Sequence, residues 1–180
     1  MRPLVTPLFL GCLALASQLP ASAQTAPAAK PADVGSMDGI LAAVYDVISG
    51  PPGQARDWDR FRSLFAPGAR LVPTGKDSTG AGRIRMWTVE DYVKNAAPGL
   101  EKSGFFEREI GRTVERYGNA AHVFSAYDSK RLATDEKPFS RGINSIQLWN
   151  DGSRWWVVTI FWESETPANP IPAKYLKPGR

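Results

Sequence analysis

Residues 139–164 read FSRGINSIQLWNDGSRWWVVTIFWES, and this stretch decides the fold class. Two runs rich in β-branched and aromatic residues flank the NDGS segment at 150–153, which has the composition of a tight turn. The pattern predicts two antiparallel strands, over 139–149 and 154–164. Because the WWVV segment at 155–158 is bulky on both sides of its strand, we expect both faces of the sheet to be covered.

The alternation of apolar and polar residues that is typical of strands extends toward the N-terminus. Residues 105–117 and 120–130 predict two further strands joined by the two-residue turn Gly118-Asn119. A short hairpin is predicted farther upstream, between an extended piece at 69–73 and a strand at 83–87 that returns from a Gly-rich turn.

Before Gly104 the apolar period changes from 2 to 3.6, which indicates helices. One helix is predicted over 37–48 with Ser36 as its N-cap, and a shorter one over 58–65. A third is expected to begin at Thr88, with Asp91 as its capping-box partner, and to end at Pro98.

Helices followed by a run of antiparallel strands are typical of an α+β fold. We expect one strongly curved antiparallel sheet with three N-terminal helices packed on its concave face, a cystatin-like cone. The outer face then needs a cover of its own, and we expect a homodimer formed through that outer sheet face.

The first 23 residues read as a secretory signal peptide. Arg2 is followed by a mostly apolar run to Leu15, and the ASA segment at 21–23 is a cleavage motif. The predicted location is therefore periplasmic or secreted. A lipoprotein signal that uses Cys12 is the alternative. The mature chain is expected to consist of a flexible Ala/Pro-rich spacer at 24–34, a cone-fold domain at 35–165 and a Pro-rich C-terminal tail at 166–180.

Charge and residue content restrict the partners. The formal net charge of the 180-residue chain is +4, and its basic residues are scattered among acids, so we expect no nucleic-acid partner. No segment after the signal is long and apolar enough for a membrane span. One histidine and one cysteine make a metal site unexpected, and no nucleotide loop indicates a cofactor.

Three local motifs, together with the element order, carry a family resemblance. They are DWDRFRSLFAPGA at 57–69, NAAHVFSAY at 119–127 and DGSRWWVV at 151–158. The chain thereby resembles the nuclear transport factor 2-like superfamily, which includes ketosteroid isomerase, scytalone dehydratase, limonene epoxide hydrolase and the SnoaL-like polyketide cyclases. The resemblance implies a cone whose sheet and helices enclose a pocket open at one end.

Candidate site residues follow from that pocket. His122 is the single histidine and could act as a general acid or base, or be a hydrogen-bonded residue on a sheet face. Arg83 and Arg85 could bind a carboxylate or lie on a solvated edge. Asp57 is expected to cap its helix. The predicted ligand-binding residues are Tyr45, Trp58, Trp87, Tyr127, Asn144, Thr159 and Trp162.

Three functional hypotheses remain open at this point. The first is an exported module that binds a small apolar or weakly acidic molecule in the cone pocket. The second is a cofactor-free lyase, isomerase or cyclase that transfers protons through His122. The third is an exported protein with a purely structural role.

Overall fold

The structure, a computed structural model, describes residues 27–176. The predicted signal peptide and Cys12 therefore lie outside the described residues. Helices come first and most strands later, in the order α1 (Pro31–Val34), α2 (Met37–Ile48), α3 (Trp58–Ser63), β1 (Phe65–Lys76), β2 (Gly82–Ile84), α4 (Val89–Ser103), β3 (Phe106–Tyr117), β4 (Ala120–Lys130), β5 (Ser140–Asn150), β6 (Trp155–Ser164) and the 3-10 helix η1 (Ala173–Tyr175).

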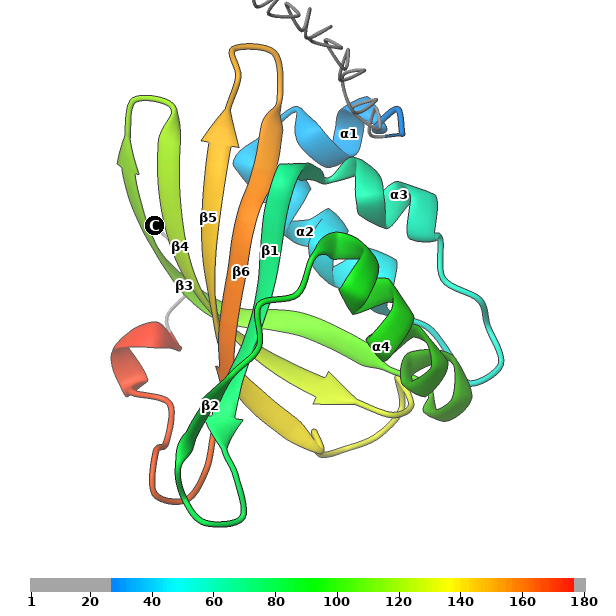
Figure 1. Cartoon of the computed structure of the whole chain (residues 1–180), viewed down its shortest axis with the longest axis vertical. Helices are drawn as coiled ribbons and strands as arrows, with labels where there is room; N and C mark the ends of the chain where they lie inside the picture. The colour runs from blue at the N-terminus through cyan, green and yellow to red at the C-terminus, as the bar shows by residue number, and fades with distance from the viewer. Residues whose placement is uncertain (1–26, 177–180) are drawn as a thin grey trace, which may run out of the picture.

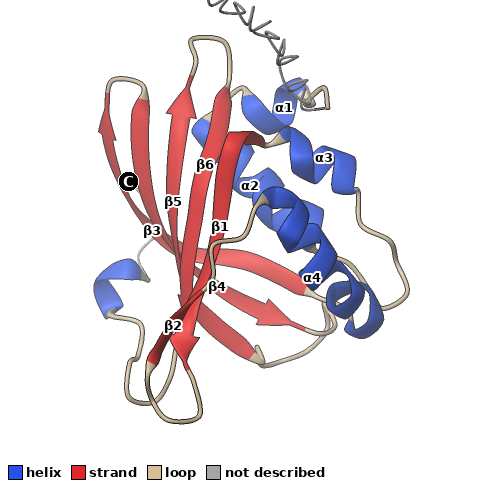
Figure 2. Ribbon diagram, viewed as in Figure 1, coloured by secondary structure: helices blue, strands red, loops and turns tan. Residues whose placement is uncertain are grey.

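The strands form one curved sheet in the order β2-β1-β6-β5-β4-β3, and the α-helices lie on one side of it (Figures 1 and 2). The α+β fold class and the strongly curved sheet are thus confirmed. One pairing differs from the prediction, because β1 pairs with β6 in parallel while the other neighbours are antiparallel. The extended piece expected at 69–73 is part of this longer strand β1, and the strand expected at 83–87 is the shorter β2.

The helices begin where their caps predict. Ser36 accepts a hydrogen bond from the Gly39 backbone N–H at 2.9 Å at the start of α2, and Thr88 and Asp91 form a capping box at the start of α4. The end of α4 was predicted wrongly, because the helix continues through Pro98 to Ser103. Proline removes one backbone donor, but the packing of Leu100 against the core helps to hold the last turns.

The core lies between the helices and the concave face of the sheet. Ile40 of α2 and Phe61 of α3 meet Val123, Ile146 and Val157 of the central strands, and all five side chains are fully buried. Amphipathic helices over a sheet are stabilised mainly by this apolar contact rather than by helix propensity. The core therefore sets the distance between the helices and the sheet, and with it the space left inside the cone.

Helix α1 lies within the segment that was predicted to be a spacer. Asp33 is buried there, and its carboxylate accepts two hydrogen bonds from the Arg60 guanidinium, at 2.7 and 3.0 Å. This bidentate pair joins α1 to α3. The last four residues of the expected 24–34 spacer are therefore part of the folded body.

A bulge in β6 decides which side chains face the helices. Leu148 pairs with Val157, but Gln147 pairs with Thr159, so Val158 is an extra residue in the ladder. Beyond the bulge Ile160 is buried, whereas Thr159 stands on the outer face. The simple alternation of side chains between the two faces of a strand is therefore broken at this point.

Part of the outer face is covered by the chain itself. The Tyr175 ring of η1 packs against Phe124 of β4 with ring centroids 4.8 Å apart. A Cβ atom on Gly111 of β3 would collide with the Tyr175 carbonyl oxygen, so the C-terminal segment packs closely against this strand. Phe161 and Val158 of β6 remain exposed. Within residues 27–176, the structure contains no helix with the length and apolar character needed to cross a membrane.

Candidate functional site

A cavity of about 240 Å³ lies between α2, α4 and the concave face of the sheet. Its lining is mostly apolar, and six of the side chains are aromatic. Within the described part of the chain, one charged residue contributes to this lining, Glu107. The lining consists of Val44, Ile48, Phe61, Leu71, Trp87, Tyr92, Ala96, Phe105, Glu107, Tyr127, Asn144, Ile160 and Trp162.

Three rings that come from different parts of the chain form one wall of the cavity. The ring centroids of Trp87, Tyr92 and Trp162 are separated by 6.3 to 6.4 Å in every pair. Backbone hydrogen bonds of 2.9 and 3.0 Å between Trp87 and Leu71 of β1 fix the chain just before α4. These three side chains, called the aromatic wall below, are thus held by α4, β1 and β6 together.

Glu107 near the start of β3 is the titratable group of the cavity. Its carboxylate accepts a hydrogen bond from the Ser129 hydroxyl at 2.8 Å, and its backbone N–H donates to the Ser49 hydroxyl at 3.0 Å. Burial raises the pKa of Glu107 to about 7, and Asp128 acts in the same direction, whereas hydrogen bonds from Ser129 and Asn144 oppose it. A carboxyl group with this pKa can both accept and donate a proton near neutral pH.

A buried hydrogen-bond network lies behind the cavity. The Tyr45 hydroxyl is 2.6 Å from the Ser125 hydroxyl and accepts a hydrogen bond from the Asn144 amide at 3.1 Å. Ser125 in turn donates to the Glu109 carboxylate. Burial raises the pKa of Tyr45, so its hydroxyl stays protonated at neutral pH. The network fixes the side chain of Asn144, which lines the cavity.

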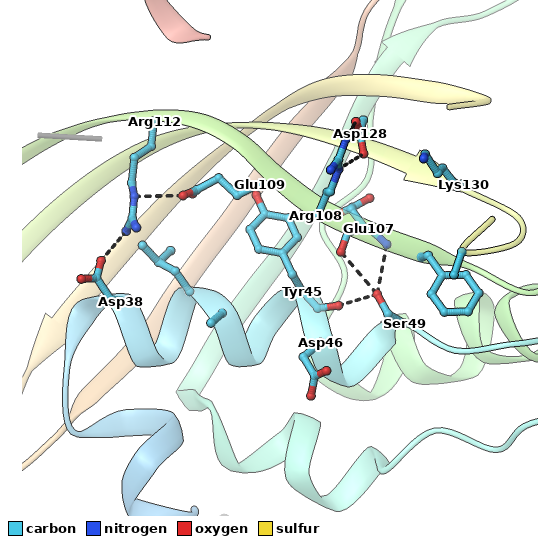
Figure 3. Close-up of a pocket in the computed structure, with 14 residues that line it drawn as sticks. Asp38, Tyr45, Asp46, Ser49, Glu107, Arg108, Glu109, Arg112, Asp128 and Lys130 are labelled. Carbon is cyan, nitrogen blue, oxygen red and sulfur yellow. Dashed lines mark hydrogen bonds and ion pairs between the residues drawn. The ribbon is translucent and has the colours of Figure 1, made fainter. Parts of the chain in front are cut away.

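A second, polar groove of about 530 Å³ runs between α2 and β3, on the other side of Glu107 (Figure 3). Its charged groups are largely paired with each other. The Arg112 guanidinium is 2.9 Å from the Asp38 carboxylate and 2.9 Å from that of Glu109, and Arg108 lies 3.0 Å from Asp128. Glu107 lines both hollows and therefore stands between a charged groove and an aromatic cavity.

The structure brings four of the predicted ligand-binding residues together. Trp87, Tyr127, Asn144 and Trp162 all line the cavity. Tyr45 lies behind them in the hydrogen-bond network.

Trp58 and Thr159 lie elsewhere. The Trp58 ring packs edge-on against Phe61, and its indole N–H donates to Glu101 at 3.2 Å, so it supports the core beside the cavity. Thr159 stands on the outer face because of the bulge.

His122 is not in the cavity, and the expectation that it would act there needs correction. Its Nε2 lies 2.9 Å from the Ser145 hydroxyl, and its ring packs edge-on against Phe124 on the outer face. Strand alternation places it opposite to its neighbours Ala121 and Val123, which are buried in the core. The single histidine is therefore a hydrogen-bonded residue of the outer sheet face.

The remaining charged candidates, Arg83, Arg85 and Asp57, do not line the cavity. Arg83 and Arg85 are exposed on and beside β2 and do not line the cavity. Asp57 accepts a hydrogen bond from the Arg60 backbone N–H at 2.9 Å and caps α3, as expected.

Sequence reasoning did not single out Glu107. It sits in the FFEREI run at 105–110, where two glutamates alternate with an arginine and a solvated strand edge is the ordinary interpretation. The available signal was its position directly after a bulky apolar pair at the start of a strand. Only the tertiary fold shows that Glu107 lines a cavity together with residues of α4 and Tyr127.

Replacing Glu107 with Gln should change how stability depends on pH. The pKa of Glu107 is raised from 4.5 to about 7 on folding, so the folded state binds its proton more tightly than the unfolded state. Wild-type stability should thus fall as pH rises from about 4.5 to 7, whereas Glu107→Gln should lack this contribution. The free energy of unfolding of the variant minus that of the wild type should be about 2 kcal/mol larger at pH 8 than at pH 4, after allowance for partial exposure. Urea unfolding at both pH values measures this, and an unchanged difference would contradict it.

Comparisons with known proteins bear on the fold. No protein-family model matches the chain, and no curated protein matches it either. Among solved structures, a protein of unknown function with a cystatin-like fold from Nostoc punctiforme is similar, with a TM-score of 0.54 at 13% identity, covering 76% of this chain and 92% of that one. A protein from Kribbella flavida has a TM-score of 0.53 at 11% identity, covering 73% and 90%.

A third structure has nuclear transport factor 2 in its description. This NTF-2 like protein of unknown function from Silicibacter pomeroyi has a TM-score of 0.50 at 11% identity, covering 73% of this chain and 94% of that one. At these identities the likeness concerns the fold. The cone fold of the nuclear transport factor 2-like and cystatin-like proteins is therefore confirmed.

Proposed function

We propose that this protein is an exported domain that binds a small molecule inside the cone cavity. The observation that supports this best is the composition of the lining, in which aromatic and aliphatic side chains surround two polar groups, Glu107 and Asn144. Ligand sites are commonly concave and apolar, with a few fixed polar groups that orient the ligand. At about 240 Å³ the space is slightly below the usual range of roughly 300–1,000 Å³, which favours a small ligand.

The experiment is a binding measurement with a variant that fills the cavity. Ala96 on α4 lines the cavity, whereas Lys94 on the same helix is exposed and does not. We expect tert-butylbenzene to raise the melting temperature of the wild-type protein and of Lys94→Phe, because a ligand that binds only the folded state stabilises it. Ala96→Phe should abolish this shift. A shift that survives in Ala96→Phe would place the binding outside the cavity and contradict the proposal.

A second function is favoured by one observation. The pKa of about 7 at Glu107 makes this residue, rather than His122, the candidate general acid or base of a cofactor-free lyase, isomerase or cyclase. For a ligand that is turned over, Glu107→Gln should abolish turnover while binding remains. Equal turnover by wild type and variant would exclude this role.

Export and assembly complete the proposal. If the signal peptide is removed as proposed, mass spectrometry of the secreted fraction should find a chain that begins at Gln24. The exposed Phe161 and Val158 support a homodimer through the part of the outer face that η1 leaves open. Sedimentation equilibrium showing a monomer at micromolar concentration would contradict the dimer.

A further inference from the structure

Within the described residues, the cavity lining has one acidic side chain and no basic one. Glu107 supplies a carboxylate, and within the described chain neither lysine nor arginine contributes to the lining. The aromatic wall formed by Trp87, Tyr92 and Trp162 belongs to the same cavity. Burial is the main cause of the raised hydroxyl pKa values of Tyr92 and Tyr127. The negative charge of Glu107 raises both pKa values further, so Glu107 is close enough to act electrostatically on these two rings. The carboxylate and the aromatic rings thus face one small space.

We propose that the ligand of this cavity is a small organic cation, whose ammonium group pairs with the Glu107 carboxylate and contacts the aromatic wall. This inference rests on the proposed function, because it names the chemical class of the molecule bound in the same cavity. It replaces the expected apolar or weakly acidic ligand with a basic one.

The alternatives fit the lining less well. An anion would face the negative charge of Glu107 without a basic side chain to pair with it, which is costly in an apolar space. A neutral apolar molecule would displace water from the carboxylate without replacing its interactions. A cation pairs with the carboxylate and also interacts favourably with the faces of tryptophan and tyrosine rings.

Proton binding at Glu107 competes with the cation. Since burial holds the pKa of this carboxyl at about 7, part of the population is protonated at pH 6, and a cation must displace that proton. Affinity for the cation should therefore rise between pH 6 and 8. The other charged and titratable groups that line the cavity and the groove together with Glu107 are Asp38, Tyr45, Asp46, Tyr92, Arg108, Glu109, Arg112, Tyr127, Asp128 and Lys130.

The test uses two probes of the same shape. Phenyltrimethylammonium and tert-butylbenzene differ in having a charged nitrogen or a neutral carbon at the branch point, and benzoate represents the weakly acidic class. Tryptophan fluorescence titrations of the whole protein at pH 6 and pH 8 give the dissociation constants. Glu107→Gln is the test variant. Glu115→Gln is its matched control, because Glu115 lies on the same strand, its side chain is 82% exposed, and it lines neither the cavity nor the groove.

We expect wild type and Glu115→Gln to bind the cation at least about tenfold more tightly than tert-butylbenzene at pH 8, with a smaller preference at pH 6. In Glu107→Gln the preference and its pH dependence should both shrink several-fold while tert-butylbenzene binding is unchanged. Equal or tighter binding of tert-butylbenzene or benzoate by the wild type would overturn the cation inference and leave small-molecule binding intact. A preference retained in Glu107→Gln would also overturn it. Failure of all three probes to bind would remove the cation inference together with the proposed function.

Discussion

Phe61→Ala should lower the free energy of unfolding by about 4 kcal/mol, the largest effect that we expect from a single side chain in this protein. Phe61 is 1% exposed, and its ring centroid lies 4.7 Å from that of Phe65, 5.2 Å from Tyr92 and 5.5 Å from Trp58. Alanine would remove contacts with α4, β1 and the rest of α3 together. Because the ring also lines the cavity, the vacated space would join an existing hollow. Equilibrium urea unfolding measures the loss.

Phe139→Ala is the matched control for that measurement. Phe139 is 48% exposed and contacts Phe105 and Arg131 near the surface, so we expect a loss within about 1 kcal/mol. Similar losses in both variants would mean that the core between helices and sheet does not dominate stability. A small loss in Phe61→Ala alone would mean that the aromatic cluster can collapse into the cavity.

Arg56→Met should lower the free energy of unfolding by about 3 kcal/mol. Arg56 is 6% exposed, and its guanidinium donates to the carbonyl oxygens of Ile48, Gly50 and Leu100 at 3.0, 2.7 and 3.2 Å. It thereby ties the end of α2 and the following loop to the last turns of α4. Methionine keeps much of the side-chain length but leaves these acceptors without a donor.

Arg83→Met is the control for this loss. Arg83 is exposed on β2, and its replacement should change stability by no more than about 0.5 kcal/mol. In thermal and urea unfolding, Arg56→Met should be clearly less stable than Arg83→Met. Equal stabilities of the two variants would show that water replaces the Arg56 hydrogen bonds and that the loop is not held by them.

Local patterns were sufficient to predict most elements of the fold. The Ser36 cap, the Thr88-Asp91 box and the strand alternation are each encoded within a few residues, and the structure contains the corresponding helices and strands. The parallel pairing of β1 with β6 and the bulge at Val158 depend on residues far apart in the chain. Local sequence patterns do not reveal such pairings, and strand alternation alone therefore does not give the face on which each β6 side chain lies beyond the bulge.

The candidate site shows the same division. Trp87, Tyr127, Asn144 and Trp162 were chosen because aromatic and amide side chains suit a cone pocket, and the fold does bring them together. His122 was chosen by residue type, whereas its strand parity turns it outward toward Ser145. The carboxylate of Glu107 acquires its unusual proton affinity only after other elements enclose it, so a sequence pattern carries little trace of it.

The parallel contact between β1 and β6 also has a consequence for the order of folding. The hairpins from β3 to β6 join neighbours in sequence, but β1 must await β6, the last strand to leave the ribosome, before it gains its partner. Long-range pairings of this kind slow folding, to times on the order of milliseconds to seconds. A chain that still lacks β6 would expose the unpaired edges of β1 and β5, and a partially synthesised form of this domain is thus the state in which aggregation should be sought.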